Sequence, residues 1–99
     1  MAKYRKKPVV IEAVRLGWDT WCEVCDFVTR ESFVGGVYLD DETKEPLPPD
    51  KHSNTMGLYL MTLEGQMLAR QGDWIIKGAK GEFYSCRDDV FKATYEEVP

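Results

Sequence analysis

Three cysteines and one histidine are the side chains of this chain best suited to bind a metal ion. Cys22 and Cys25 form a Cys-x-x-Cys pair, and Cys86 and His52 could complete a zinc site of the Cys₃His type. Structural zinc ligands usually come as two closely spaced pairs, however, whereas Cys86 and His52 are each isolated in the sequence. Cys25 also lies on the apolar stripe of a predicted helix, where a free cysteine acts as a small hydrophobic residue. We therefore predict reduced thiols, with no metal and no cofactor, and keep zinc as the alternative.

The chain carries none of the motifs GxSxG, P-loop, HExxH or dinucleotide fingerprint. A cysteine–histidine catalytic pair would need His52, in a polar loop, to meet Cys22 or Cys86, and no spacing predicts that meeting. The expected class is therefore a non-enzymatic protein.

Aromatic and basic side chains gather in the last third of the chain, where they could bind a small anionic ligand such as a nucleotide. The aromatic rings would stack on its planar group, and the basic groups would hold its phosphate. The alternative is that the tryptophan is part of the core and the lysines are solvated. The candidate ligand-binding residues are Trp74, Lys77, Lys80, Tyr84 and Arg70, with Arg87 nearby in sequence.

Residues 40–55 form the longest stretch without apolar periodicity, which predicts an exposed acidic loop partly extended by its prolines. Loops of this length are commonly either functional or mobile. This one could bind a basic surface of a protein partner, or it could be a tolerated insertion. The candidate partner-binding residues are Asp40, Asp41, Glu42, Glu45 and Asp50.

The charge of the chain is unevenly distributed. Its net charge is −4, yet residues 1–7 hold four basic groups and no acid, so residues 8–99 carry a net charge of −8. The basic arm 1–7 could contact phosphates, or it could be a solvated chain end. Duplex DNA is not an expected partner, because an acidic body with a pI near 5.0 does not suit it. No apolar run approaches the ~18 residues of a membrane span, and the start lacks the apolar stretch of a secretory signal.

The stretch Gln71–Tyr84 organises the predicted fold. A Gly-Asp turn, the strand Trp74–Ile76, a glycine-flanked turn and the partner strand 82–86 predict a hairpin. Alternation places Trp74 and Ile76 on one face, and we expect both to anchor the core together with Phe83.

The other elements follow from apolar periodicity. A first strand should start at Pro8 with Val9, Ile11 and Ala13 facing inward. An amphipathic helix should follow over about residues 20–29, with Asp19 as its N-cap. The remaining expected elements are a strand at 33–39 with a bulge at its double glycine, a hairpin of strands 58–63 and 66–70, a helical turn at 87–92 capped by Asp88, and a terminal strand or packed tail at 93–98.

These elements predict one α+β domain over residues 1–99. Its expected architecture is a mostly antiparallel sheet of about five or six strands with one amphipathic helix packed on it. A curled, partly closed sheet is the alternative arrangement.

Several segments together resemble a family of small uncharacterised proteins of tailed phages and prophages, built around a Pro-Gly-Asp-Tyr-Gly-like segment. The matching pieces are Lys6–Ala13, Thr62–Gly65, Gly72–Gly78, Gly81–Tyr84, Phe91 and 94–96. Gln71 and Trp74 depart from the pattern, since proline and tyrosine are common there. The resemblance implies a phage or prophage origin but no catalytic residues.

The leading hypothesis is therefore a phage accessory protein, located in the bacterial cytoplasm, that binds a host protein or a small anionic ligand. Counter-defence is one such role. The alternative is an oligomeric structural or assembly module of the phage particle.

Overall fold

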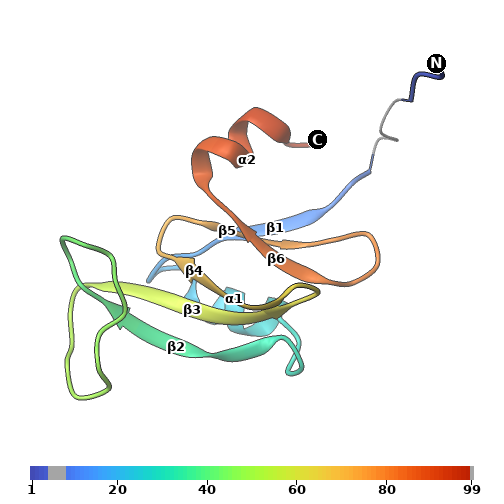
Figure 1. Cartoon of the computed structure of the whole chain (residues 1–99). Helices are drawn as coiled ribbons and strands as arrows, with labels where there is room; N and C mark the ends of the chain where they lie inside the picture. Colours follow the sequence, from blue (N-terminus) through green and yellow to red (C-terminus); the bar gives the residue numbers. More distant parts are fainter. Residues whose placement is uncertain (5–8, 99) are drawn as a thin grey trace.

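Six strands and two helices make up the fold in the computed structural model, which describes residues 1–4 and 9–98. The strands form two antiparallel three-stranded sheets, ordered β1-β5-β6 and β2-β3-β4 (Figure 1). The predicted α+β class with six antiparallel strands is confirmed, although the strands divide between two sheets. The elements are β1 (Glu12–Arg15), α1 (Trp21–Phe27), β2 (Phe33–Leu39), β3 (Thr55–Thr62), β4 (Gly65–Arg70), β5 (Trp74–Lys77), β6 (Phe83–Cys86) and α2 (Asp88–Thr94).

The sheet β2-β3-β4 is a meander of consecutive strands. β3 and β4 pair as the predicted hairpin, from Gly57 opposite Arg70 to Thr62 opposite Gly65. The register between β2 and β3 shifts between Phe33 and Gly35, which confirms a bulge beside the double glycine.

The sheet β1-β5-β6 combines the two ends of the chain. β5 and β6 form the predicted central hairpin, with Trp74 opposite Cys86 and Lys77 opposite Phe83. β1 pairs with the other edge of β5. β5 is therefore the middle strand of its sheet.

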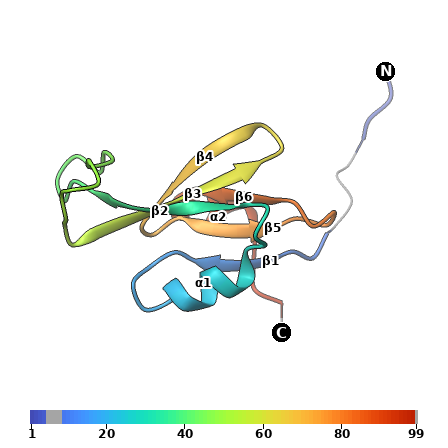
Figure 2. The same ribbon diagram turned by 90° about the horizontal axis from the view of Figure 1, so that it is seen from below.

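The core lies between the two sheets and α1, which runs alongside β1 (Figure 2). Fully burying an aliphatic or aromatic side chain stabilises the fold by roughly 1.5–3 kcal/mol. α1 contributes Val24, and Val28, the residue after the helix, is buried as well; both belong to the predicted apolar stripe. Its N-cap residue is Thr20 rather than the predicted Asp19, and the Thr20 hydroxyl donates to the Arg15 carbonyl. The core cluster consists of Leu16, Val24, Val28, Met56, Leu58, Leu60, Ala69, Ile75 and Phe83.

The predicted inward face of the first strand is wrong. Val14 and Leu16 face the core, whereas Val9 is 51% exposed and Ala13 lies on the opposite face. The reason is that α2 covers this opposite face, so both faces of the sheet bury apolar side chains. β1 starts at Glu12, and Pro8 lies outside the described residues.

The central hairpin is buried on both faces for the same reason. Phe83 and Ile75 point into the core, and Ile76 is fully buried on the α2 side. Trp74 is half-buried on that side, where its ring stacks on Phe91 of α2 at 4.1 Å between centroids and 8° between planes. Trp74 therefore anchors α2 rather than the main core.

α2 is longer than the predicted helical turn, and its cap residue is Arg87 rather than Asp88. Residues 95–98 form no strand. Of the predicted basic arm 1–7, only residues 1–4 are described. None of the helices in residues 1–4 and 9–98 has the length and apolar character needed to cross a membrane.

Candidate binding sites

A hollow of about 240 Å³ opens between the start of α1 and β2. Its walls are the aromatic side chains Trp18, Trp21 and Tyr38, and the glycines Gly36 and Gly57 also line it. We call this set of five residues the aromatic hollow. Trp18 and Tyr38 pack on each other with 6.2 Å between ring centroids and 42° between planes, and Val37 and Met56 complete the lining. A hollow walled by aromatic rings can accept an apolar or cationic group against their faces.

The two tryptophans are held by different contacts. Trp21, on α1, packs edge-to-face on Phe33 at 6.3 Å, and its ring lies over Gly36 so closely that a Cβ there would be 2.8 Å from Cη2. Trp18 precedes the helix, and its Nε1 donates to the carbonyl of Asn54 at 2.8 Å. Trp18 is nevertheless 51% exposed, so an oriented aromatic face is open to a partner.

The loop 40–55 contacts two wall residues of the aromatic hollow, Tyr38 and Trp18. The ring of His52 packs edge-to-face on Tyr38 at 4.8 Å. The Asp41 carboxylate accepts hydrogen bonds from the Asn54 amide at 3.0 Å and the Thr55 hydroxyl at 2.7 Å. Because Asn54 also accepts from Trp18, the acidic loop and the aromatic wall form one connected surface.

Within the loop the five acidic residues divide into two groups. Asp40 accepts from the amides of Glu42 and Thr43 at 2.9 Å, and these two bonds hold the pKa of Asp40 below its ordinary value. Asp40 and Asp41 therefore shape the loop. The side chains of Glu42, Glu45 and Asp50 are exposed and make no hydrogen bond or ion pair with the described part of the chain. These three carboxylates are available to a partner.

The five residues predicted to bind an anion do not share one surface. Trp74 donates from Nε1 to Asp88 at 2.9 Å and is stacked on Phe91. Lys77 lies on the opposite face of β5 from Trp74, and Lys80 is exposed in the β5–β6 turn. The lysines are thus not arranged around the tryptophan ring.

Tyr84 belongs to the interface between the sheet and α2. Its hydroxyl lies 3.3 Å from that of Tyr95. Burial, followed by this hydrogen bond, raises the pKa of Tyr84 to about 12. Tyr84 is therefore a neutral packing residue at physiological pH.

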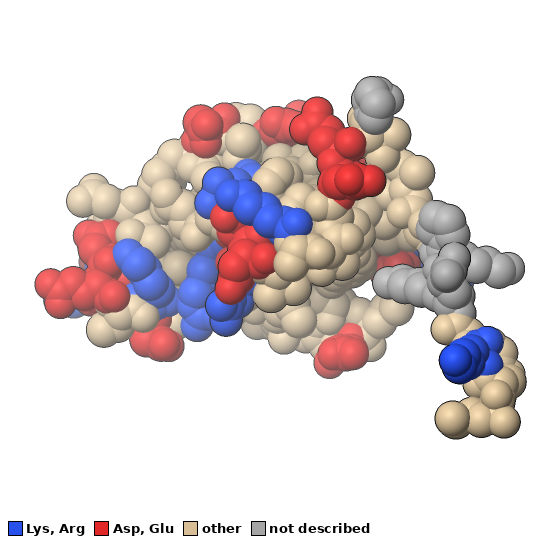
Figure 3. All heavy atoms as spheres, turned by 90° about the horizontal axis from the view of Figure 1, so that it is seen from above, with Lys and Arg blue, Asp and Glu red and all other residues tan. Residues whose placement is uncertain are grey.

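Arg70, the fifth predicted residue, lines a separate hollow of about 430 Å³. Basic side chains gather on this side of the molecule, beside the acidic side chains of the loop (Figure 3). We call this set the basic hollow; its lining residues are Lys44, Thr55, Arg70, Gln71, Asp73 and Arg87.

The predicted alternative of a zinc site finds no support in the placement of its ligands. In residues 1–4 and 9–98, no three His, Cys, Asp or Glu side chains gather where they could hold a metal ion. Cys22 is exposed, Cys25 and Cys86 are half-buried, and all three are free thiols. Burial raises the pKa of Cys25 and of Cys86, which disfavours the thiolate that would bind metal or act as a nucleophile.

Sequence reasoning missed the aromatic hollow because its walls come from three separate segments. Two signals pointed to it: the Trp-x-x-Trp spacing of residues 18–21 at a helix start, and glycines within predicted strands, which often mark a close approach. Comparison with known proteins adds no functional assignment, since no family model, curated protein or solved structure matches the chain.

Proposed function

We propose that this chain is a non-enzymatic phage or prophage accessory protein that binds a basic segment of a host protein. The observation that carries the proposal is the aromatic hollow joined to the acidic loop. A cationic side chain of the partner would pack in this hollow against Trp21 and the Trp18–Tyr38 pair, and the loop carboxylates would attract its neighbours. The phage origin and a location in the host cytoplasm follow from the sequence resemblance, and counter-defence is one role that fits.

Arginine is the partner residue best matched to this surface. Its planar guanidinium stacks on aromatic rings and keeps its charge at any physiological pH. A cation over an aromatic ring contributes roughly 0.5–1 kcal/mol at exposed sites and about 2 kcal/mol when desolvated. The hollow of about 240 Å³ is large enough to take one such side chain. Glu42, Glu45 and Asp50 would contribute chiefly to the association rate and its dependence on salt.

A titration with a short arginine-rich peptide tests the proposal, with a citrulline peptide of the same length as the uncharged control. Calorimetry should detect binding of the arginine peptide only, and Trp18→Ala should weaken it about tenfold. Leu63→Ala is the matched control, because Leu63 is an 85% exposed apolar residue in the β3–β4 turn. Equal weakening by both variants, or none by Trp18→Ala, would contradict the proposed site.

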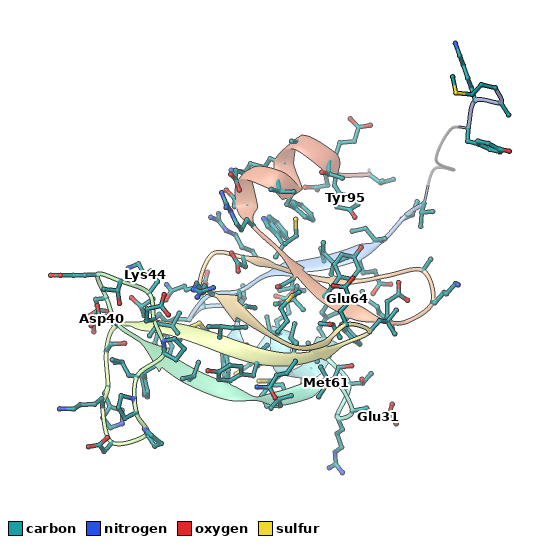
Figure 4. All side chains as sticks on the ribbon, in the orientation of Figure 1. Glu31, Asp40, Lys44, Met61, Glu64 and Tyr95 are labelled. Carbon is teal, nitrogen blue, oxygen red and sulfur yellow. The ribbon has the colours of Figure 1, made fainter. Side chains whose placement is uncertain are left out.

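The contribution of the loop is tested separately by salt dependence. The triple variant Glu42→Gln, Glu45→Gln, Asp50→Asn should bind more weakly and with a flatter dependence on salt. Glu31→Gln is its control, since Glu31 lies away from the Asp40 end of the molecule (Figure 4). In host extract, a true partner should be retained by the wild type and lost by Trp18→Ala.

A second candidate function, self-assembly as a module of the phage particle, is favoured by the edge strand β1. Among the described residues β1 pairs only with β5, and the segment before it exposes Val9 and Val10, the latter to 76%. Such an edge can pair with a second copy. Sedimentation over a wide concentration range decides: a monomer throughout removes this candidate, and an oligomer abolished by Val10→Lys supports it.

A further inference from the structure

The basic hollow brings together three cationic side chains from segments far apart in the sequence. Lys44 comes from the loop, which projects at the end of the molecule opposite Glu31 (Figure 4), Arg70 ends β4, and Arg87 precedes α2. Asp73 is the carboxylate among the lining residues. Like charges repel one another, so a fold that converges three cations leaves a favourable place for an anion.

Arg70 is held in position by the backbone around it. Its Nε donates to the carbonyl of Lys44 at 3.2 Å, and its amide donates to Asp73 Oδ2 at 2.9 Å. Lys44 adopts a left-handed backbone conformation, with φ of 63°, which a residue with a side chain adopts at some energetic cost. Among residues 1–4 and 9–98 the terminal N–H groups of Arg70 make no hydrogen bond, so they can donate to a ligand.

Two more donors complete the wall. Gln71 accepts the Met56 amide on its Oε1 at 3.2 Å, so the side-chain amide is oriented and its N–H groups remain available. Arg87 contacts Asp89 through Nε and Nη2, at 3.3 and 2.8 Å, and both side chains are largely exposed. This pair uses only Nε and Nη2, so the N–H groups of Arg87 Nη1, which make no hydrogen bond within the described part of the chain, can donate to an anion.

We propose that the basic hollow binds a phosphate monoester through the guanidinium groups of Arg70 and Arg87. The Lys44 ammonium, which donates to the carbonyl of Asp41, adds positive charge beside them. Guanidinium groups match phosphate oxygens with paired, charge-assisted hydrogen bonds. The hollow of about 430 Å³ exceeds the size of a bare phosphate and leaves space for part of an esterified group. This site shares no lining residue with the aromatic hollow, so the two proposals stand or fall independently.

An NMR titration of the amide signals with inorganic phosphate, and then with adenosine monophosphate, tests the site at constant ionic strength kept with chloride. Saturable shifts are expected at Arg70, Gln71, Asp73 and Arg87, and tighter binding of the monophosphate ester than of phosphate. Shifts that do not saturate, or that chloride reproduces, would overturn the proposal.

Three variants make the titration specific. Arg70→Gln should weaken phosphate binding about tenfold, the usual effect of losing a charged hydrogen-bond partner. Arg87→Gln, at an exposed position that the fold does not need, should weaken it as well. Lys80→Gln removes one positive charge from the exposed β5–β6 turn and should leave binding unchanged. If Lys80→Gln weakens binding as much as the arginine variants do, the effect is one of net charge and the site is refuted.

Discussion

Replacing Gly36 by alanine tests how the aromatic hollow is built, and Gly35 offers a matched control in the same strand. A Cβ at position 36 would lie 2.8 Å from Cη2 and 3.1 Å from Cζ2 of Trp21, so the ring must shift. A Cβ at position 35 would meet nothing within 4 Å. Neither glycine has a left-handed φ, so alanine fits the backbone at both positions.

The magnitude follows from two opposing effects. In a strand, alanine is about 0.5–1 kcal/mol more favourable than glycine, and this gain applies to both variants. At position 36 alone, the Trp21 ring has to be displaced from its contact with Phe33, and overpacking of this kind costs about 1–3 kcal/mol. Gly35→Ala should therefore raise the free energy of unfolding slightly, and Gly36→Ala should fall below it by about 1–3 kcal/mol.

Urea unfolding followed by circular dichroism measures this difference, and it avoids tryptophan fluorescence, which the ring shift would itself change. The Trp21 indole signal in an NMR spectrum should move in Gly36→Ala and stay in place in Gly35→Ala. If Gly36→Ala is as stable as Gly35→Ala, the close contact between the ring and the strand is not what positions Trp21, and the account of the hollow fails.

Four further predictions concern α2, Tyr84 and the loop. Phe91→Ala removes the stack on Trp74, so hydrogen exchange should quicken in α2 while the core strands keep their protection; equal loss in both would contradict separate docking. Tyr95→Phe removes a hydrogen bond that raises the pKa of Tyr84, so the phenolate of Tyr84 should form below pH 12, as ultraviolet absorbance would show. Folded Tyr84 keeps a proton that the unfolded chain loses above pH 10, so the free energy of unfolding should fall as pH rises from about 10 to 12. If the wild type shows no such fall, the pKa of Tyr84 is not raised in the folded protein. Asp41→Ala removes two solvent-exposed hydrogen bonds and should lower stability by about 0.5–1.5 kcal/mol in urea unfolding, whereas Asp50→Asn should change little.

The elements that the sequence predicted best are those defined by short-range patterns. Both hairpins, the bulge near Gly35 and the apolar stripe of α1 depend on neighbours within a few residues, and all are present. The face of β1 was wrong because its assignment assumed a sheet with a single apolar side. No short-range pattern in the sequence indicates that α2, a short helix without a buried residue, covers the second face of the sheet β1-β5-β6.

The candidate sites were harder to predict, because convergence depends on topology. Trp74 and Lys77 are close in sequence, yet their positions in β5 place them on opposite faces. Arg70 and Arg87 line the same hollow, but the third cation, Lys44, comes from the loop predicted to contact a protein partner. Residue type and closeness in sequence therefore did not indicate which of these side chains share a surface.

The pairing of β1 with β5 constrains the order in which this protein can be assembled during synthesis. The meander β2-β3-β4 uses consecutive strands and can form as soon as β4 has been made. The pairing of Glu12 with Lys77 can form only after β5 has been synthesised. The β1 segment, which is made first, therefore has no partner strand until most of the chain has emerged. A chain that ends before β5 would leave β1 without its partner strand and the core without Ile75 and Phe83. The last quarter of the sequence thus determines when the first strand becomes part of the fold.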